Sequence, residues 1–165
     1  MTNRIEKAID IFLDAVNNGT LAKGTCTACA VGNLVAHGMN GTISKRKSEN
    51  GDYLVFRTDV DSCGWSDAFV TTEGEQTIYE NSFNEPWVLK NVEATDFTIQ
   101  ELAQIEFTFE TNTEIHHNRY NLTTAEEIRA DQIKGLEAVV KLMMTFDDVK
   151  ADVKKVFTNK LQPVS

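Results

Sequence analysis

The stretch TTAEEIRADQIKGLEAVVKLMMTF, residues 123–146, decides the fold class of this chain. Its apolar side chains recur three and four residues apart, which is the spacing of an amphipathic α-helix. Thr123 and Glu126 have the spacing of a capping box, in which two side chains satisfy free backbone N–H groups at a helix start. We therefore predict a long helix whose wide apolar face lies in a core. Its predicted inward positions are Ile133, Leu136, Val139, Val140, Leu142, Met143 and Phe146.

Helical patterns also occur in four other segments. Residues 5–16 have the same apolar spacing and predict a second helix. We expect this helix to stop at Gly19, because glycine tolerates the left-handed backbone that often terminates a helix. Residues 98–111 begin with another capping box, and residues 26–37 form a helix of unusually small side chains. Residues 147–160 carry aspartates early and lysines late, which suits the helix macrodipole.

The middle of the chain loses this helical spacing. The Asn-Gly pair that ends at Gly51 lies between residues 42–45 and the β-forming residues 53–57, which predicts a hairpin. Residues 61–92 hold aromatic side chains among glycines and acids and are expected to form an irregular connection that contains short helical or extended pieces. We predict a mainly α (α+β) domain over residues 1–165, with about five helices and a small β-hairpin-containing insertion between the second and third.

The acidic charge of the chain is regional. The net charge is −9, and residues 61–120 carry twelve acidic side chains against Lys90 and Arg119. Such a surface repels phosphate backbones, so we expect no nucleic-acid partner. The run Lys45-Arg46-Lys47 is a basic cluster beside a turn, and this position favours a solvated hairpin.

The N-terminal sequence and the cysteines indicate a compartment. The first residues are charged and lack the apolar core of a signal peptide, and no apolar run approaches the about 18 residues that span a bilayer. We expect a cytoplasmic protein that is neither exported by that route nor inserted in a membrane. Cys26, Cys29 and Cys63 are an odd number, so reduced thiols are favoured over a disulfide framework.

Cys26 and Cys29 form a C-x-x-C pair at the expected start of a helix, and three interpretations compete. The pair could bind zinc with Cys63 and His37, or with the histidines at 116–117, although half of the usual four-cysteine signature is missing. It could be a redox pair stabilised by the helix N-terminus, although no strand precedes it as in thioredoxin-like sites. The favoured interpretation is structural, with small sulfur side chains packed between helices.

Two further arrangements could carry chemistry. Cys26 could act as a nucleophile with a distant histidine, but no supporting motif surrounds it. Glu106 and Glu110 lie one helical turn apart, ahead of Glu114 and the histidines at 116–117, and could form a metal cluster. Helical di-metal proteins carry Glu-x-x-His pairs within their helices, and no predicted helix here has one, so a solvated face is favoured.

Several short runs resemble a known group of proteins. They are CTACAVGNL at 26–34, GW at 64–65, AFVT at 68–71 and ELAQIEFTFE at 101–110. Together they resemble small uncharacterised C-x-x-C proteins of gut-type bacteria and their phages, over roughly residues 20 to 145. The resemblance implies a phage or mobile-element accessory protein, a class that often acts by binding, and it assigns a role to no residue.

From these observations we expect a small, acidic, non-enzymatic binding or regulatory protein. It would present the acidic region 61–120 to a protein or a small ligand, without a cofactor. Trp65, Tyr79 and Trp87 are the predicted contact residues because aromatic side chains are enriched at interfaces, although core packing is the favoured role of Trp65. The alternative is a metal- or thiol-dependent protein centred on the three cysteines, with zinc as its metal.

Overall fold

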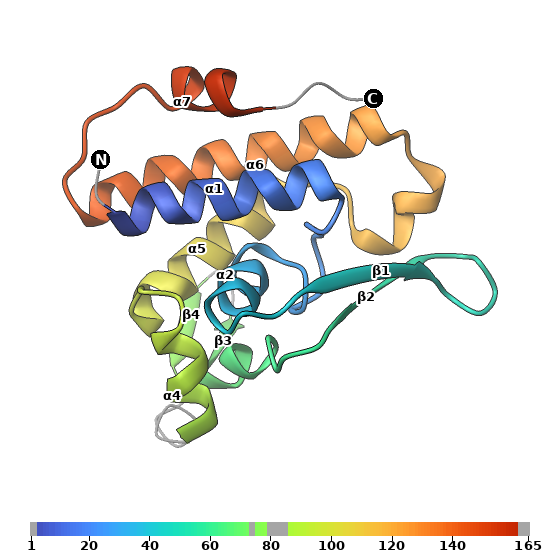
Figure 1. Ribbon diagram of the computed structural model, residues 1–165, viewed down its shortest axis with the longest axis horizontal. Helices are drawn as coiled ribbons and strands as arrows, with labels where there is room; N and C mark the ends of the chain where they lie inside the picture. The colour runs from blue at the N-terminus through green and yellow to red at the C-terminus, as the bar shows by residue number, and fades with distance from the viewer. Residues whose placement is uncertain (1–2, 73–74, 79–85, 162–165) are drawn as a thin grey trace.

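The computed structural model describes residues 3–72, 75–78 and 86–161. Its helical body is built on α1 (Asn3–Asn18) and α6 (Ala125–Phe146), which lie side by side and run in opposite directions (Figure 1). The amphipathic spacing of both segments gives each helix one apolar face, and these faces meet. α7 (Val153–Lys160) follows α6 and packs against it.

α5 (Ile99–Asn112) and α2 (Ala30–Gly38) complete the helical core. α5 packs closely on α6 because Gly135, in the middle of α6, has no side chain, and a Cβ there would collide with Thr113. α2 contacts both α1 and α5. Its residues from 30 to 36 are all buried, which small side chains permit because neighbouring backbones can approach closely.

Two antiparallel hairpins lie between α2 and α5 in the sequence. β1 (Ile43–Lys47) pairs with β2 (Leu54–Thr58), with Lys45 opposite Phe56, and this hairpin extends away from the helical body (Figure 1). β3 (Phe69–Thr72) pairs with β4 (Glu75–Ile78) in a separate two-stranded sheet. The remaining elements are η1 (Gly64–Ala68), α4 (Pro86–Glu93) and η2 (His117–Leu122), where η denotes a 3₁₀ helix.

Two groups of buried apolar side chains hold these elements together. The main core joins α1, α2, α5 and α6, and its largest members include Phe12, Ile9, Leu34, Leu102, Ile105, Phe109, Leu136 and Met143. A second core lies under the β1–β2 hairpin, where Phe56 meets Tyr120 of η2 edge to face with ring centroids 6.3 Å apart. Ala22 and Ala28 complete it, so the hairpin is anchored by its inner face.

The predicted fold class is confirmed, but several boundaries differ from the prediction. The helix expected from Cys26 begins at Ala30, because residues 26–29 form a turn that Cys29 ends as the N-cap. α6 is capped by Thr124, one residue after the predicted capping threonine. The region 61–92 contains η1, β3, β4 and most of α4, which are the kind of short helical and extended pieces expected within this connection.

Other predicted ends are confirmed. Thr98 and Glu101 form the expected capping box at the start of α5, with both reciprocal hydrogen bonds present. α1 ends before Gly19, whose φ of 70° is in the left-handed region. Among the helices of the described residues, none has both the length and the apolar character that crossing a membrane requires.

Candidate functional site

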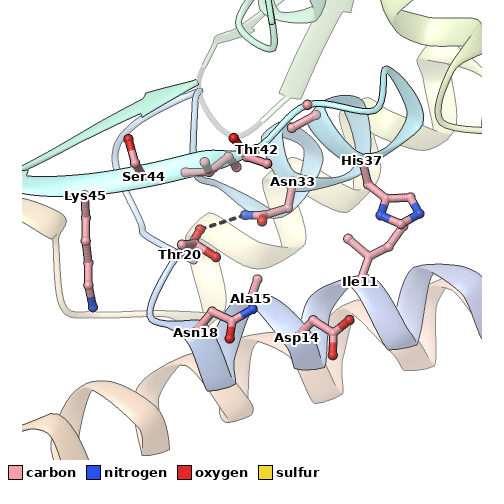
Figure 2. A pocket seen from close by; sticks show the side chains of 13 residues that line it. Ile11, Asp14, Ala15, Asn18, Thr20, Asn33, His37, Thr42, Ser44 and Lys45 are labelled. Atoms are coloured by element: carbon pink, nitrogen blue, oxygen red, sulfur yellow. Dashed lines mark hydrogen bonds between the residues drawn. The ribbon is translucent and has the colours of Figure 1, made fainter. Parts of the chain in front are cut away.

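A cleft of about 540 Å³ lies between α1, the C-terminal half of α2 and the start of β1. We call it the α1–β1 cleft, and Figure 2 shows side chains from the three elements around it. α1 supplies Ile11, Asp14, Ala15 and Asn18 to one wall, and residues 41–45 form the opposite wall. α2 closes the cleft between these two walls with Asn33, Ala36 and His37.

Asn33 of α2 fixes the floor of the cleft. Its Nδ2 donates hydrogen bonds to the backbone carbonyls of Thr20 (3.0 Å), Ala28 (3.0 Å) and Cys29 (3.1 Å). Asn33 is almost fully buried. The Ala28 and Cys29 carbonyls also accept backbone N–H groups, so the Asn33 amide adds a second hydrogen bond to each of them and one to the Thr20 carbonyl. The connection between α1 and α2 is therefore held firmly against α2.

The start of β1 is held by Asp59. Its carboxylate accepts hydrogen bonds from the Thr42 backbone N–H (2.7 Å) and the Thr42 hydroxyl (3.3 Å). Just before it, the Gly41 N–H donates to the Ala36 carbonyl (2.8 Å), and a Cβ at Gly41 would collide with Val60. Glycine is needed for this close approach, which sets where β1 leaves α2 and forms the wall opposite α1.

The two ends of the cleft differ in charge. Lys45 reaches from β1 toward the end of α1, where its Nζ lies beside Gly19. Figure 2 shows Lys45 at one end of the cleft and His37 at the other, with Asp14 on α1 between them and nearer to His37. Ile11 adds apolar surface, so the cleft can hold a ligand through hydrogen bonds and a small apolar contact.

Cys26 and Cys63 form a disulfide, so the expectation of reduced thiols is wrong for this pair. Their Cα atoms lie 5.1 Å apart, within the range that a disulfide spans. Sequence spacing could not show this contact, because the fold brings Cys63, which precedes η1, to the turn before α2. The Thr27 hydroxyl also lies 3.1 Å from Cys63 Sγ.

Cys29 is the N-cap of α2 and does not pair with Cys26. Its Sγ accepts a hydrogen bond from the Gly32 N–H at 3.2 Å, and the side chain is fully buried. Burial and the neighbouring Glu106 raise the pKa of the Cys29 thiol well above its ordinary value. Cys29 is therefore a neutral, unreactive thiol, which agrees with the structural interpretation of this residue.

The predicted zinc ligands are not brought together. His37 and Cys29 lie at opposite ends of α2, about 12 Å apart along the helix axis, and Cys26 and Cys63 are bonded to each other. In the described parts of the chain, no group of three or more His, Cys, Asp or Glu side chains is placed to hold a metal. The metal-binding alternative therefore has no assembled site among these residues.

Glu106 on α5 points into the protein, so the predicted solvated face is wrong for this residue. Its Oε2 is buried and has no hydrogen-bond partner among the described residues. Burial, and the adjacent Glu110, raise the pKa of Glu106 well above its ordinary value. The surroundings of Glu106 therefore favour its protonated form, because α5 turns the side chain toward Cys29 at the N-terminal end of α2.

The three predicted aromatic contact residues have different environments. Trp65 is 2% exposed and belongs to the main core, in line with its favoured role in packing. Trp87 is 42% exposed and its ring lies over Gly64 of η1. Tyr79 lies outside the described residues. Trp65, being buried, therefore does not share a contact surface with the exposed Trp87.

Sequence reasoning singled out His37, as a candidate zinc ligand, and missed the other cleft residues of α1 and α2. Asp14 and Asn18 occupy exposed positions of an amphipathic helix, where polar side chains are the rule, so no signal distinguished them. Asn33 did carry a signal, because it is an amide within a segment of alanine, valine and leucine that the pattern predicts to be buried. A buried amide must have partners, and here they shape the floor of the cleft.

No protein-family model, curated protein or solved structure matches this chain. The resemblance to gut-bacterial and phage proteins therefore stays a prediction.

Proposed function

We propose that this chain is a non-enzymatic binding or regulatory protein whose ligand occupies the α1–β1 cleft. The observation that supports this proposal is the composition of the cleft. Charged and neutral hydrogen-bonding groups, among them Asp14, Asn18 and Lys45, surround a small apolar patch formed by Ile11 and Ala15. Concave sites with an apolar patch and a few converging polar groups bind ligands by shape and orientation.

This site replaces the aromatic surface that the sequence suggested. Trp65 is buried in the core and is not available for contact. Trp87 is exposed and stays available for a second contact outside the cleft. The acidic region 61–120 would then act through its charge, which disfavours the binding of polyanions.

The proposal extends to the setting of the protein. The sequence resemblance supports an accessory protein of a phage or mobile element that acts in the cytoplasm on a host protein or a small ligand. A cleft lined by charged and hydrogen-bonding groups is consistent with such an accessory protein, because proteins of this class often act by binding their target.

Titration of ¹⁵N-labelled protein with two probe sets, capped hexapeptides and free amino acids, tests the site. Amide shifts should concentrate on Asn18, Asn33 and residues 41–45. Asn18→Trp places an indole at the cleft wall and should weaken binding about tenfold, because overfilling a packed site costs on the order of 1–3 kcal/mol. Glu6→Trp, an exposed change on the same helix, is the matched control. Shifts confined to the surroundings of Trp87 would contradict the proposal.

The Cys26–Cys63 disulfide favours a second candidate function, redox regulation through these thiols. Both cysteines are partly exposed, so a cellular thiol can reach the bond. A disulfide in the cytoplasm is typically transient and redox-sensing. Alkylation of acid-quenched cells that express the chain measures the oxidised fraction, which should rise with a thiol oxidant and fall with a reductant. An oxidised fraction that changes with neither the oxidant nor the reductant would contradict redox regulation.

A further inference from the structure

Within the part of the chain that the structure describes, β1 has one paired edge and one open edge. Its sheet there has two strands, and β2 covers one side of β1. Two backbone hydrogen bonds frame the pairing: the Ser48 N–H donates to the Tyr53 carbonyl (2.9 Å), and the Asp59 N–H donates to the Thr42 carbonyl (3.4 Å). Residues 42 and 48 are therefore hydrogen-bonded positions of an antiparallel ladder.

Hydrogen-bonded positions alternate along an antiparallel strand. Ser44 and Arg46, which share the even register of residues 42 and 48, direct their backbone groups toward β2. Ile43, Lys45 and Lys47 direct theirs away from β2. Among the described residues, no hydrogen bond reaches the backbone groups of these three positions. The open edge therefore offers three N–H donors and three carbonyl acceptors over a strand about 17 Å long.

The open strand forms one wall of the α1–β1 cleft. Ile43 and Lys45 line the cleft, and α1 forms the opposite wall. Figure 2 shows β1 running past α1, with Lys45 pointing toward α1. A peptide in an extended conformation fits such a space, because main-chain hydrogen bonds to the strand give affinity and alternate side chains enter the cleft.

The charge of the strand specifies the kind of peptide. The hairpin residues 43–58 carry four basic and two acidic side chains, within a chain of net charge −9. Lys45, Arg46 and Lys47 are all exposed on β1. Opposite charges on neighbouring strands stabilise a sheet, and like charges directly opposite each other destabilise it. The open edge therefore favours acidic side chains on an added strand.

We propose that β1 binds an acidic, extended segment of another polypeptide as a third strand of the hairpin, within the α1–β1 cleft. This inference rests on the proposed binding function and names its partner class. Acidic side chains would lie next to Lys45 and Lys47, which share one face of β1, and small apolar side chains would alternate with them on the opposite face of the added strand.

Charge also decides between this occupant and two others. A second copy of the chain, paired edge to edge through β1, would place basic strands against each other, which is unfavourable. A single-stranded nucleic acid would meet the same basic side chains, but it offers no ladder of backbone N–H and carbonyl groups for the open edge. An acidic peptide satisfies both the charges and the free backbone groups.

The probe is an acetylated, amidated heptapeptide of sequence TEVEVET. Hydrogen exchange of the labelled protein should show new protection of the Lys45 and Lys47 amides, and of Ile43, when the peptide is bound. The amides of Ser44 and Arg46 are bonded to β2 already and should change little. This alternation along one strand is a signature of strand pairing that binding by side chains alone does not produce.

Two substitutions at one position separate backbone pairing from charge. Lys45→Gln removes the charge and keeps the outward N–H, so binding should weaken about threefold. Lys45→Pro also removes the N–H, and binding should weaken about tenfold or more. Proline at an outward-facing edge position leaves the bonds to β2 intact. Retained protection of the Ser44 and Arg46 amides confirms that this variant keeps the hairpin.

The outcomes separate the strand inference from the broader proposal. Binding that shifts cleft residues without protecting the Lys45 and Lys47 amides overturns strand pairing and leaves a cleft-binding function in place. No binding of TEVEVET at millimolar concentration, or equal binding of the lysine analogue TKVKVKT, also overturns the inference. Tighter binding of oligo(dT) than of the peptide assigns the edge to nucleic acid and overturns it as well.

Discussion

Arg4 ties the start of α1 to two other parts of the helical body. Its guanidinium donates to both carboxylate oxygens of Glu101 (2.8 and 2.9 Å) and of Asp147 (2.8 and 2.6 Å). It also lies 4.8 Å from the centroid of the Phe97 ring. Only the planar fork of arginine can hold two carboxylates in this way, and a lysine cannot replace it.

Arg4→Met should lower the free energy of unfolding by about 1–3 kcal/mol at pH 7, because two partly buried carboxylates lose their partner. Partial burial alone would raise the pKa of Glu101, but hydrogen bonds from Arg4 and Thr98 outweigh it and lower this pKa. A lowered pKa stabilises the fold above the unfolded value, and this contribution disappears as the pH falls through the folded value. The cost of Arg4→Met should therefore shrink below about pH 4.

Urea unfolding between pH 7 and pH 3 measures this effect. Lys7→Met is the matched control, since it removes an exposed ion pair to Asp96 from the same helix. Exposed pairs contribute little, so this change should have a small effect at every pH. Equal losses for the two variants would show that the Arg4 bonds do not stabilise the fold.

Glu106 gives a pH dependence of the opposite sign. Burial and then Glu110 raise its pKa, so ionisation of the carboxyl destabilises the folded state progressively as the pH rises above the unfolded value near 4.3. Glu106→Gln should raise the melting temperature at pH 7.5, by about 2–4 °C for each kcal/mol gained, and the gain should vanish near pH 4. Glu49→Gln, an exposed change in the hairpin loop, is the control. A gain that is independent of pH would contradict a raised pKa of Glu106 in the folded protein.

At the scale of elements, the C-x-x-C turn exists because of Gly32. A Cβ at Gly32 would collide with the backbone carbonyls of Cys26 and Thr27, so the turn can fold back on the first turn of α2 only over a glycine. Cys29 then caps the helix, and Cys26 is turned outward to meet Cys63. The motif is therefore a way to fix a turn and a crosslink, and the two cysteines that define it have separate roles.

Loss of the Cys26–Cys63 disulfide, which joins the turn before α2 to the residue before η1, should lower the free energy of unfolding. The disulfide links residues 37 apart, and closing a loop of that length stabilises a fold by about 4 kcal/mol in the chain-entropy account. Cys63→Ser should therefore lower the guanidinium midpoint and abolish its sensitivity to dithiothreitol. Cys29→Ser keeps a capping oxygen and should preserve that sensitivity. If dithiothreitol did not change the guanidinium midpoint of the unsubstituted protein, the disulfide would not be present.

The elements show which features local sequence can predict. α1, α5 and α6 were predicted because apolar spacing and caps are local, and the β1–β2 hairpin because its turn signal lies within a few residues. The Cys26–Cys63 bond and the inward turn of Glu106 depend on contacts between distant segments. The basic run at 45–47 was correctly placed on a hairpin, but only the register shows that its strand has an open edge.

On the scale of the whole molecule, the helices and the hairpin pack on two separate groups of buried apolar side chains. The main core joins the helices, while the second core joins the hairpin to η2 through Phe56 and Tyr120. Gln132 of α6 links them, because its Nε2 donates to the Tyr120 hydroxyl at 3.0 Å and to the Leu21 carbonyl at 2.5 Å. A small core with few links is expected to open before the rest, since local stability follows buried apolar contact.

Native-state hydrogen exchange in low guanidinium tests this division. The Ser44 and Arg46 amides should exchange through an opening of lower free energy than the amides in the middle of α6. Leu136→Ala removes a side chain of the main core and should lower protection in α6 by about 2–5 kcal/mol. It should leave hairpin opening unchanged, because the main core stays folded when only the hairpin opens. Phe56→Ala should lower the protection of both the hairpin amides and the α6 amides, because the contact of Phe56 with Tyr120 is lost in local opening of the hairpin and in global unfolding. If Leu136→Ala weakened the hairpin amides equally, the molecule would unfold as a single unit, and the strand edge at the cleft would be as rigid as the helices around it.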